Sequence, residues 1–274
     1  MARITHDRAE PAAYESSRGG HFEERRLRLV AQTISAEKAG EVVELGAGTG
    51  RITARLAERF PLASFTAVEI DEHLVAYGQS TYRLDNLNWS RELPAVGSAD
   101  VVFSIDVIHH FDDRPKMFDL VNDTLRPGGL WLAIEPNLWH PAMAVAQERM
   151  KRQGLGENHF VPWTSEPEFR RAGFVIHSRR YCHTWPAAFK TPPVWAKRLE
   201  AWAEGSSLAR LINGSVVYLL RRSFRAPRSP GVRSTTPQSS CSPHSVLSLP
   251  DHRPARGSSP SRTARVQGQQ PMEG

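Results

Sequence analysis

The residues with the clearest chemical signature are an acid and three glycines that follow a short apolar run. Glu44 precedes glycines at positions 46, 48 and 50, and a helical pattern begins at Arg51. A strand, a glycine turn and a helix in this order present backbone N–H groups and a helix N-terminus to a ligand. Glycine suits such a turn because it tolerates positive φ and brings no Cβ against the ligand. We therefore expect a ligand to lie across Gly46, Ala47, Gly48 and Gly50.

The spacing of the glycines separates two classes of ligand. A dinucleotide fingerprint, G-x-G-x-x-G, needs a glycine at position 51, where this chain has Arg51. Glu44 at the end of the strand would repel a pyrophosphate, whereas it would attract the amino group of a nucleoside that carries an amino acid. S-adenosylmethionine is the common ligand of that kind. The alternative is a glycine-rich turn that binds no ligand.

The stretch from Val42 to Gly50 resembles the first motif of class I S-adenosylmethionine-dependent methyltransferases, and the resemblance extends over about residues 20–224. It implies that Glu44 lies near the ammonium group of the cofactor and that Glu69 binds the ribose hydroxyls from the end of the second strand. The family often has an acid after the third strand, but Trp89, Ser90 and Arg91 stand there instead. The cofactor contacts implied in addition to the two acids and the glycine turn are Ile70, Ser90 and Asp106.

Two adjacent histidines, His109 and His110, follow the fourth predicted strand and precede Asp112 and Asp113. Three interpretations stay open for them. A histidine beside the transferred methyl could remove a proton from the acceptor. The pair could instead hold the following helix, or bind a metal with an aspartate, although adjacent side chains of a strand point in opposite directions. We name His110 and His109 as candidate catalytic residues and expect no metal.

The elements that position these residues alternate along the chain. Strand patterns are expected at 42–45, 65–71, 87–89, 100–105, 130–134, 174–181 and 215–220. Helical patterns are expected at 21–34, 51–60, 114–125 and 142–152, and in short segments that begin near 72 and 165. This alternation predicts an α/β, Rossmann-like fold with a doubly wound, seven-stranded, mostly parallel sheet. The resemblance implies that the seventh strand is antiparallel.

Several helical segments allow more than one interpretation. The helix at 21–34 either covers the cofactor or packs with a solvated charged face, and residues 139–163 form either a lid over the acceptor or an inserted core layer. Ser165 and Glu168 have the spacing of a capping box that opens a helix. In a second insertion, the helical spacing of Trp195, Leu199 and Trp202 favours core positions over a site.

The composition divides the chain. The formal charge is +6, but residues 225–274 hold seven arginines against two acids, which leaves +1 for residues 1–224. The same segment has eight of the 20 prolines and no aromatic residue. We therefore expect a flexible lead-in at 1–20, a methyltransferase domain at 21–224 and a disordered Pro/Ser/Arg-rich tail at 225–274. The near-neutral domain argues against a nucleic-acid partner.

Three further features of the sequence bear on the cellular compartment of the protein. No stretch reaches the roughly 18 apolar residues of a membrane span, and the N-terminus has no signal-peptide pattern. Cys182 and Cys241 lie far apart in the sequence and outside any C-x-x-C pair, so neither a zinc site nor a disulfide framework is expected. A cytoplasmic protein is the expectation.

The resemblance implies a reaction: SN2 transfer of the methyl group of S-adenosylmethionine to an O, N or C atom of a small-molecule acceptor. An S-adenosylmethionine- or nucleoside-binding protein of the same fold without methyl transfer is the alternative. An NAD-dependent oxidoreductase is disfavoured by Arg51. The N/D-P-P-[YFW] motif of amino-methylating enzymes is not matched by Glu135-Pro136-Asn137. The acceptor and the oligomeric state stay open.

Overall fold

The structure is a computed structural model that describes residues 11, 15, 19–152, 159–185 and 190–224. The chain divides into two compact units, Met1–Pro227 and Arg228–Gly274. The second unit lies outside the described residues, as do the tail predicted at 225–274 and most of the lead-in predicted at 1–20.

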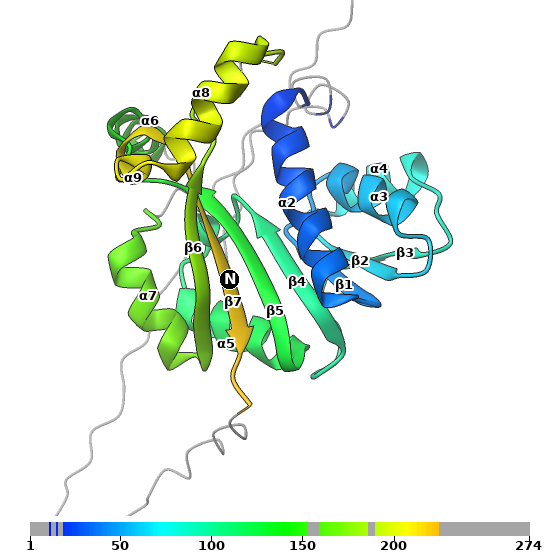
Figure 1. Cartoon of the computed structure of the whole chain (residues 1–274). Helices are drawn as coiled ribbons and strands as arrows, with labels where there is room; N and C mark the ends of the chain where they lie inside the picture. Colours follow the sequence, from blue (N-terminus) through cyan, green and yellow to red (C-terminus); the bar gives the residue numbers. More distant parts are fainter. Residues whose placement is uncertain (1–10, 12–14, 16–18, 153–158, 186–189, 225–274) are drawn as a thin grey trace, which may run out of the picture. The chain divides into compact units, whose positions relative to one another are not determined.

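The centre of the first unit is a seven-stranded sheet with the order β3-β2-β1-β4-β5-β7-β6 (Figure 1). Its strands are β1 Glu41–Leu45, β2 Ser64–Val68, β3 Leu87–Ser90, β4 Ala99–Ile105, β5 Leu125–Pro136, β6 Phe174–Cys182 and β7 Ser215–Arg222. The pairs among β1 to β5 are parallel, whereas β7 pairs antiparallel with both β5 and β6. The predicted doubly wound, mostly parallel sheet is therefore confirmed.

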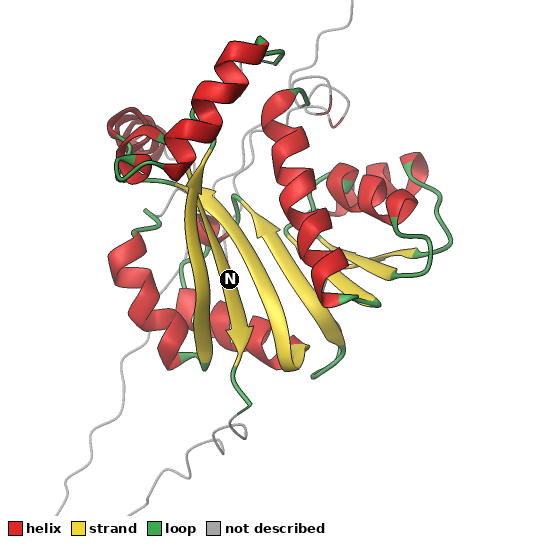
Figure 2. Ribbon diagram, in the orientation of Figure 1, coloured by secondary structure: helices red, strands yellow, loops and turns green. Residues whose placement is uncertain are grey.

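Helices cover both faces of this sheet (Figure 2). They are α2 His21–Glu37, α3 Arg51–Arg59, α4 Glu72–Thr81, η1 Ile108–His110, α5 Arg114–Thr124, α6 Pro141–Arg152, α7 Pro162–Arg171, α8 Val194–Gly205 and α9 Ala209–Ile212. One hydrophobic cluster joins the sheet to α2 and α3 through residues such as Val30 and Leu56, and another joins it to α5 and α7 through Phe118 and Phe169. These two clusters bury large apolar side chains on both sides of the sheet, which supplies most of the driving force for folding.

The central strands end together, which brings their exits to one edge. β1 is in register with β2 and with β4, so Leu45 lies beside Val68 and Ser104. The residues that follow these strands therefore meet at the carboxyl edge of the sheet, where open parallel sheets bind ligands. Asp71 caps α4 through the N–H groups of His73 and Leu74, as its position predicts.

Two sequence predictions about helices are wrong. Helix α7 begins at Pro162 after Val161 and has no side-chain cap, so Ser165 lies inside the helix with a buried hydroxyl that has no partner. Proline suits the first helical position because its φ is already helical, and it starts the helix one turn before the predicted capping box. Trp195, Leu199 and Trp202 are exposed on α8, not buried in the core.

None of the helices among the described residues is long and apolar enough to cross a membrane.

Candidate functional site

The glycine turn after β1 has the backbone that its sequence requires. Gly46, Gly48 and Gly50 have φ values of 71°, 58° and 76°, in the left-handed region that glycine tolerates best. A Cβ on Gly46 would lie 2.6 Å from Val107 Cγ2, and a Cβ on Gly50 would lie 2.2 Å from Trp89 Cη2. Packing against β3 and the exit of β4 therefore demands glycine at these two positions, independently of any ligand.

The turn is fixed by bonds to the end of β2. The N–H groups of Gly46 and Ala47 both donate to the carbonyl of Val68, at 2.8 Å and 3.0 Å. The N–H of Gly48 donates to Glu69 Oε2 at 2.8 Å, and that of Gly50 donates to the carbonyl of Ala47 at 2.9 Å. These N–H groups are engaged inside the protein, so the sequence-based expectation that they face a ligand is not met in this structure.

Glu69 connects the glycine turn to the start of α4. It follows β2 directly and is 7% exposed. In addition to the bond from Gly48, its Oε1 accepts bonds from the N–H groups of Ile70 and Asp71, at 2.8 Å and 3.0 Å. A carboxylate has about four lone-pair positions, so three bonds leave room for about one more donor, such as a hydroxyl. Ile70 is 49% exposed beside it and offers an apolar surface at the same edge.

Glu44 has a different environment from the one that the sequence suggests. Its carboxyl is 3% exposed and accepts a hydrogen bond from the Thr53 hydroxyl on α3. Burial raises the pKa of Glu44 to about 8. A carboxyl with this pKa is mostly neutral at pH 7, so the electrostatic reason for placing it near an ammonium group no longer holds.

Asp106 is held at the exit of β4 by α2. Its φ is 56°, and its Oδ2 pairs with Arg26 Nη2 at 2.5 Å. The Asp106 side chain is 30% exposed, whereas that of Arg26 is 7% exposed. The Nε of Arg26 is buried without a hydrogen-bond partner. An unpartnered buried donor of this kind fits a carboxylate ligand, because it would otherwise carry the full cost of its desolvation.

The two histidines have different surroundings. His109 is buried, and its Nδ1 lies 2.7 Å from Glu135 Oε2 at the end of β5. Glu135 is fully buried, and its other oxygen accepts bonds from the N–H groups of Val107 and Ile108. His110 is partly exposed, and its ring centroid lies 4.2 Å from that of His109. The contact between His109 and Glu135 thus links the exit of β4 to the end of β5. His110 is the more accessible of the two imidazoles.

The expectation that the side chains of the two histidines point in opposite directions is wrong. They lie in the short 3₁₀ helix η1 and not in a strand, so their rings lie beside each other. Within the described part of the chain, no group of three or more His, Cys, Asp or Glu residues could hold a metal ion.

Ser90 is occupied by a local turn. Its hydroxyl donates to the carbonyl of Glu92 at 2.5 Å and accepts from the N–H of the same residue at 3.1 Å. Its carbonyl accepts the N–H of Glu69 at 3.0 Å. The Ser90 side chain therefore shapes the exit of β3, and a contact with the adenine of a cofactor remains a prediction.

Several charged residues of α2 are paired with other helices, whereas Glu24 and Arg28 are exposed. Glu23 is buried and accepts bonds from Arg51 at the start of α3. On the other side, Arg25 pairs with Glu204 at 2.5 Å and with Glu200 at 3.3 Å, both on α8. Helix α2 thus spans from the glycine turn to α8, and only the part of its charged face with Glu24 and Arg28 is solvated.

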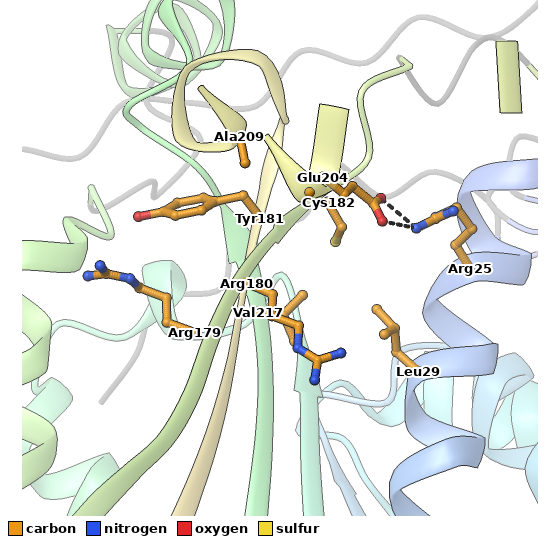
Figure 3. Close-up of a pocket in the computed structure, with 10 residues that line it drawn as sticks. Arg25, Leu29, Arg179, Arg180, Tyr181, Cys182, Glu204, Ala209 and Val217 are labelled. Atoms are coloured by element: carbon orange, nitrogen blue, oxygen red, sulfur yellow. Dashed lines mark hydrogen bonds and ion pairs between the residues drawn. The ribbon is translucent and has the colours of Figure 1, made fainter. Parts of the chain in front are cut away.

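A pocket of about 360 Å³ lies beside α2, apart from the predicted site residues (Figure 3). It is lined by Arg25, Leu29, Arg179, Arg180, Tyr181, Cys182, Glu204, Gly205, Ala209 and Val217. Burial raises the pKa of the Cys182 thiol above its ordinary value, so the thiol stays protonated and is a poor nucleophile. None of the residues predicted to hold the cofactor or to act in catalysis lines this pocket.

Sequence reasoning missed two residues that organise the edge. Arg26 shares α2 with several other charged residues, and nothing in their spacing marks the one that reaches β4. Glu135 did carry a signal, because it is an acid at the carboxyl end of a predicted strand, as Glu69 is.

Comparisons with known proteins agree with the strand order and the glycine turn. Residues 43–131 match the family described as "Methyltransferase domain". The trans-aconitate 2-methyltransferase of Rhizobium leguminosarum bv. trifolii is 25% identical over 219 residues, which are 72% of this chain and 80% of that protein. The trans-aconitate 2-methyltransferase of Deinococcus radiodurans is 34% identical over 99 residues, 35% of this chain and 37% of that protein.

A solved structure has the same fold. The S-adenosylmethionine-dependent methyltransferase from Mesorhizobium loti superposes with a TM-score of 0.50 at 18% identity, covering 66% of this chain and 90% of that one. The matched methyltransferase domain, the sheet order and the glycine turn after β1 together support a class I S-adenosylmethionine-dependent methyltransferase with S-adenosylmethionine as its cofactor.

Proposed function

We propose that this methyltransferase acts on a small-molecule acceptor, at an O, N or C atom, through a catalytic domain that spans residues 21–224. The observation that carries the proposal is that Glu69, Asp106 and His110 follow β2 and β4, the two parallel strands on either side of β1 and its glycine turn. The names of the relatives support it, since trans-aconitate is a small carboxylic acid. The near-neutral charge of residues 1–224 gives no support to a nucleic-acid acceptor.

The residues at this edge suit the parts of the cofactor. Glu69 has a remaining acceptor position for a ribose hydroxyl, and the exposed Ile70 would pack against the adenine. Arg26, with its unpartnered Nε, would bind the carboxylate of the methionine part, and Asp106 beside it would face the ammonium group. The glycines at 46, 48 and 50, together with Ala47, would let the backbone approach without a bulky side chain. We assign Glu44 to packing against Thr53.

The chemistry that the cofactor supplies is an electrophilic methyl group on a sulfonium. Bound S-adenosylmethionine would supply this methyl group for SN2 attack by the acceptor atom, and the electron pair of the broken carbon–sulfur bond would go to sulfur. The protein aligns the acceptor, and an acceptor hydroxyl or amine also loses a proton. We assign that proton transfer to His110, because it is the accessible imidazole at the exit of β4, and we assign His109 to positioning through Glu135.

The test is methyl transfer from labelled S-adenosylmethionine by the full chain. A panel of small carboxylic acids, phenols and amines is compared with DNA and RNA oligonucleotides, and S-adenosylhomocysteine release is measured. We expect release with at least one small acceptor and none with the oligonucleotides. Transfer to an oligonucleotide alone would contradict the proposal, as would cofactor binding without transfer to any small acceptor in a broad panel.

A further inference from the structure

Helix α8 exposes its large apolar side chains, whereas a helix that packs only on its own domain buries them. The residues that it buries are small or charged: Ala196, Glu200 and Ala203. Its large apolar residues point outward, with exposures of 66% for Val194, 63% for Trp195, 42% for Leu199 and 63% for Trp202. A helix that only covers the surface of its domain buries its large apolar residues and exposes its charged residues.

Ion pairs fix the orientation of α8. Glu200 is 1% exposed, and its Oε2 lies 2.5 Å from His21 Nε2 and 3.3 Å from Arg25 Nη1. Glu204 accepts two bonds from Arg25, as Figure 3 shows. Both carboxylates of the helix therefore face α2, and turning the tryptophans inward would leave these buried charges without partners.

The outward face carries positive charge only. Lys197 and Arg198 are exposed and, within the described residues, form no ion pair. At 100° per residue, Arg198 projects between Val194 and Trp202, whereas Lys197 lies about 60° beyond Val194, at the edge of this face. Aromatic and aliphatic side chains with interspersed cations are typical of a helix that lies in the headgroup region of a lipid bilayer.

Further exposed apolar residues lie near the end of the sheet where α8 lies. Figure 1 shows α6, α8 and α9 gathered at the end where β4 and β5 terminate. After α8 the chain exposes two more leucines, Leu208 at 53% and Leu211 at 40%. Trp139, which follows β5, is 37% exposed and lies under the guanidinium of Arg210 at 5.4 Å. The combination of apolar and cationic groups thus extends beyond α8.

We propose that the outward face of α8 docks this enzyme on an anionic lipid surface, with Trp195 and Trp202 in the headgroup region and Lys197 and Arg198 on lipid phosphates. Tryptophan favours this region because its ring is apolar and its N–H can still reach water or lipid oxygens.

The positive charge of this face disfavours two other binding partners, namely a second copy of the chain and residues 225–274. A two-fold dimer through α8 would bring the Lys197–Arg198 pairs of two copies close together, and like charges across an interface oppose association. Residues 225–274 have an excess of five positive charges and no aromatic residue, so they suit this cationic face poorly. An anionic bilayer complements both the face and that segment.

The test is flotation of the full chain with vesicles of phosphatidylcholine, with and without phosphatidylglycerol. We expect binding that requires the anionic lipid and weakens with added salt. The double variant Trp195→Gln/Trp202→Gln should bind about tenfold more weakly or worse, and so should Lys197→Gln/Arg198→Gln. Glutamine keeps the helix propensity of these exposed positions, so the thermal unfolding midpoint should not change.

Matched controls use exposed residues elsewhere. Leu62→Ser removes a fully exposed leucine between α3 and β2, and Arg83→Gln removes an exposed arginine after α4; both should bind as the parent chain does. The proposal is overturned if the parent chain does not float with anionic vesicles, or if the α8 variants float as well as the controls. A lipid-free dimer that the tryptophan variant dissociates would also overturn it, because the occupant would then be a second copy.

Discussion

Three acids follow or end adjacent strands, and each has a different environment. Glu44 is buried against Thr53, Glu69 accepts three backbone N–H groups, and Asp106 pairs with Arg26. The sequence predicts all three positions because strand ends can be recognised from apolar runs and glycines. It does not predict the charge state of Glu44, since burial in the folded chain raises the pKa of this carboxyl.

Glu44 gives a prediction about pH. Its folded-state pKa of about 8 lies above the ordinary value of 4.5. The folded chain therefore holds more protons than the unfolded chain between these values, and this contribution to stability falls as the pH rises from about 5 to about 8. Glu44→Gln should remove that fall, which amounts to roughly a few kcal/mol. Urea unfolding at several pH values measures it, and equal pH slopes for parent and variant would show that Glu44 is ionised in the folded state.

The histidines give a second prediction. His109→Ala should cost about 1–3 kcal/mol of unfolding free energy, because the buried carboxylate of Glu135 loses a partner. His110→Ala should slow turnover about 10²-fold and leave the affinity for S-adenosylhomocysteine unchanged, as expected for a base. Steady-state kinetics and chemical unfolding of both variants separate the roles. Parallel loss of stability and activity in the His110 variant would assign it to structure instead.

At the scale of elements, helix α2 decides how the site is built. Apolar periodicity predicts the helix, and it is found at His21–Glu37. The pattern predicts either a helix that covers the cofactor or one with a solvated charged face, yet Glu23 and Arg25 contact α3 and α8. Such partners lie far away in the sequence, so a helical pattern alone cannot identify them. The outward face of α8 escaped prediction for the same reason: helical spacing shows that Trp195 and Trp202 share a face, but not which way that face points.

Arg26 tests the importance of α2 for the cofactor. Arg26→Gln should weaken the binding of S-adenosylhomocysteine about tenfold or more, because a charged donor to the cofactor carboxylate is lost. Arg28→Gln is the matched control, since Arg28 is exposed on the same helix. Calorimetric titration of both folded variants gives the answer. An Arg26 variant with the affinity of the control would remove this side chain from the cofactor site.

At the scale of the whole molecule, the order and direction of the strands follow from the alternation of patterns and from the resemblance. Strands of β-branched residues separated by helical stripes favour a doubly wound sheet, and all seven predicted strands are present. The ends of the strands are less predictable: β5 begins at Leu125, five residues before the predicted strand at 130–134. Propensity does not reveal such an extension, in which Leu125 pairs with Ala99 of β4 while the pairing with β7 starts only at Leu130.

The composition of the last fifty residues gives a further prediction. Truncation after Phe224 should leave the thermal unfolding midpoint and the affinity for S-adenosylhomocysteine unchanged, because a segment so poor in apolar residues adds little to a core. Differential scanning calorimetry and titration of the truncated and full chains provide the comparison. A large drop in either quantity would mean that residues 225–274 are part of the folded unit.

The most direct test of the account is calorimetric titration of the full chain with S-adenosylhomocysteine and with NAD, repeated on Glu69→Ala and on the exposed control Glu92→Gln. We predict that the parent chain binds S-adenosylhomocysteine and not NAD. Glu69→Ala should lower that affinity about tenfold or more, and Glu92→Gln should not change it. Equal binding of NAD, or full affinity in the Glu69 variant, would contradict the claim that the edge formed by the glycine turn and Glu69 holds the cofactor.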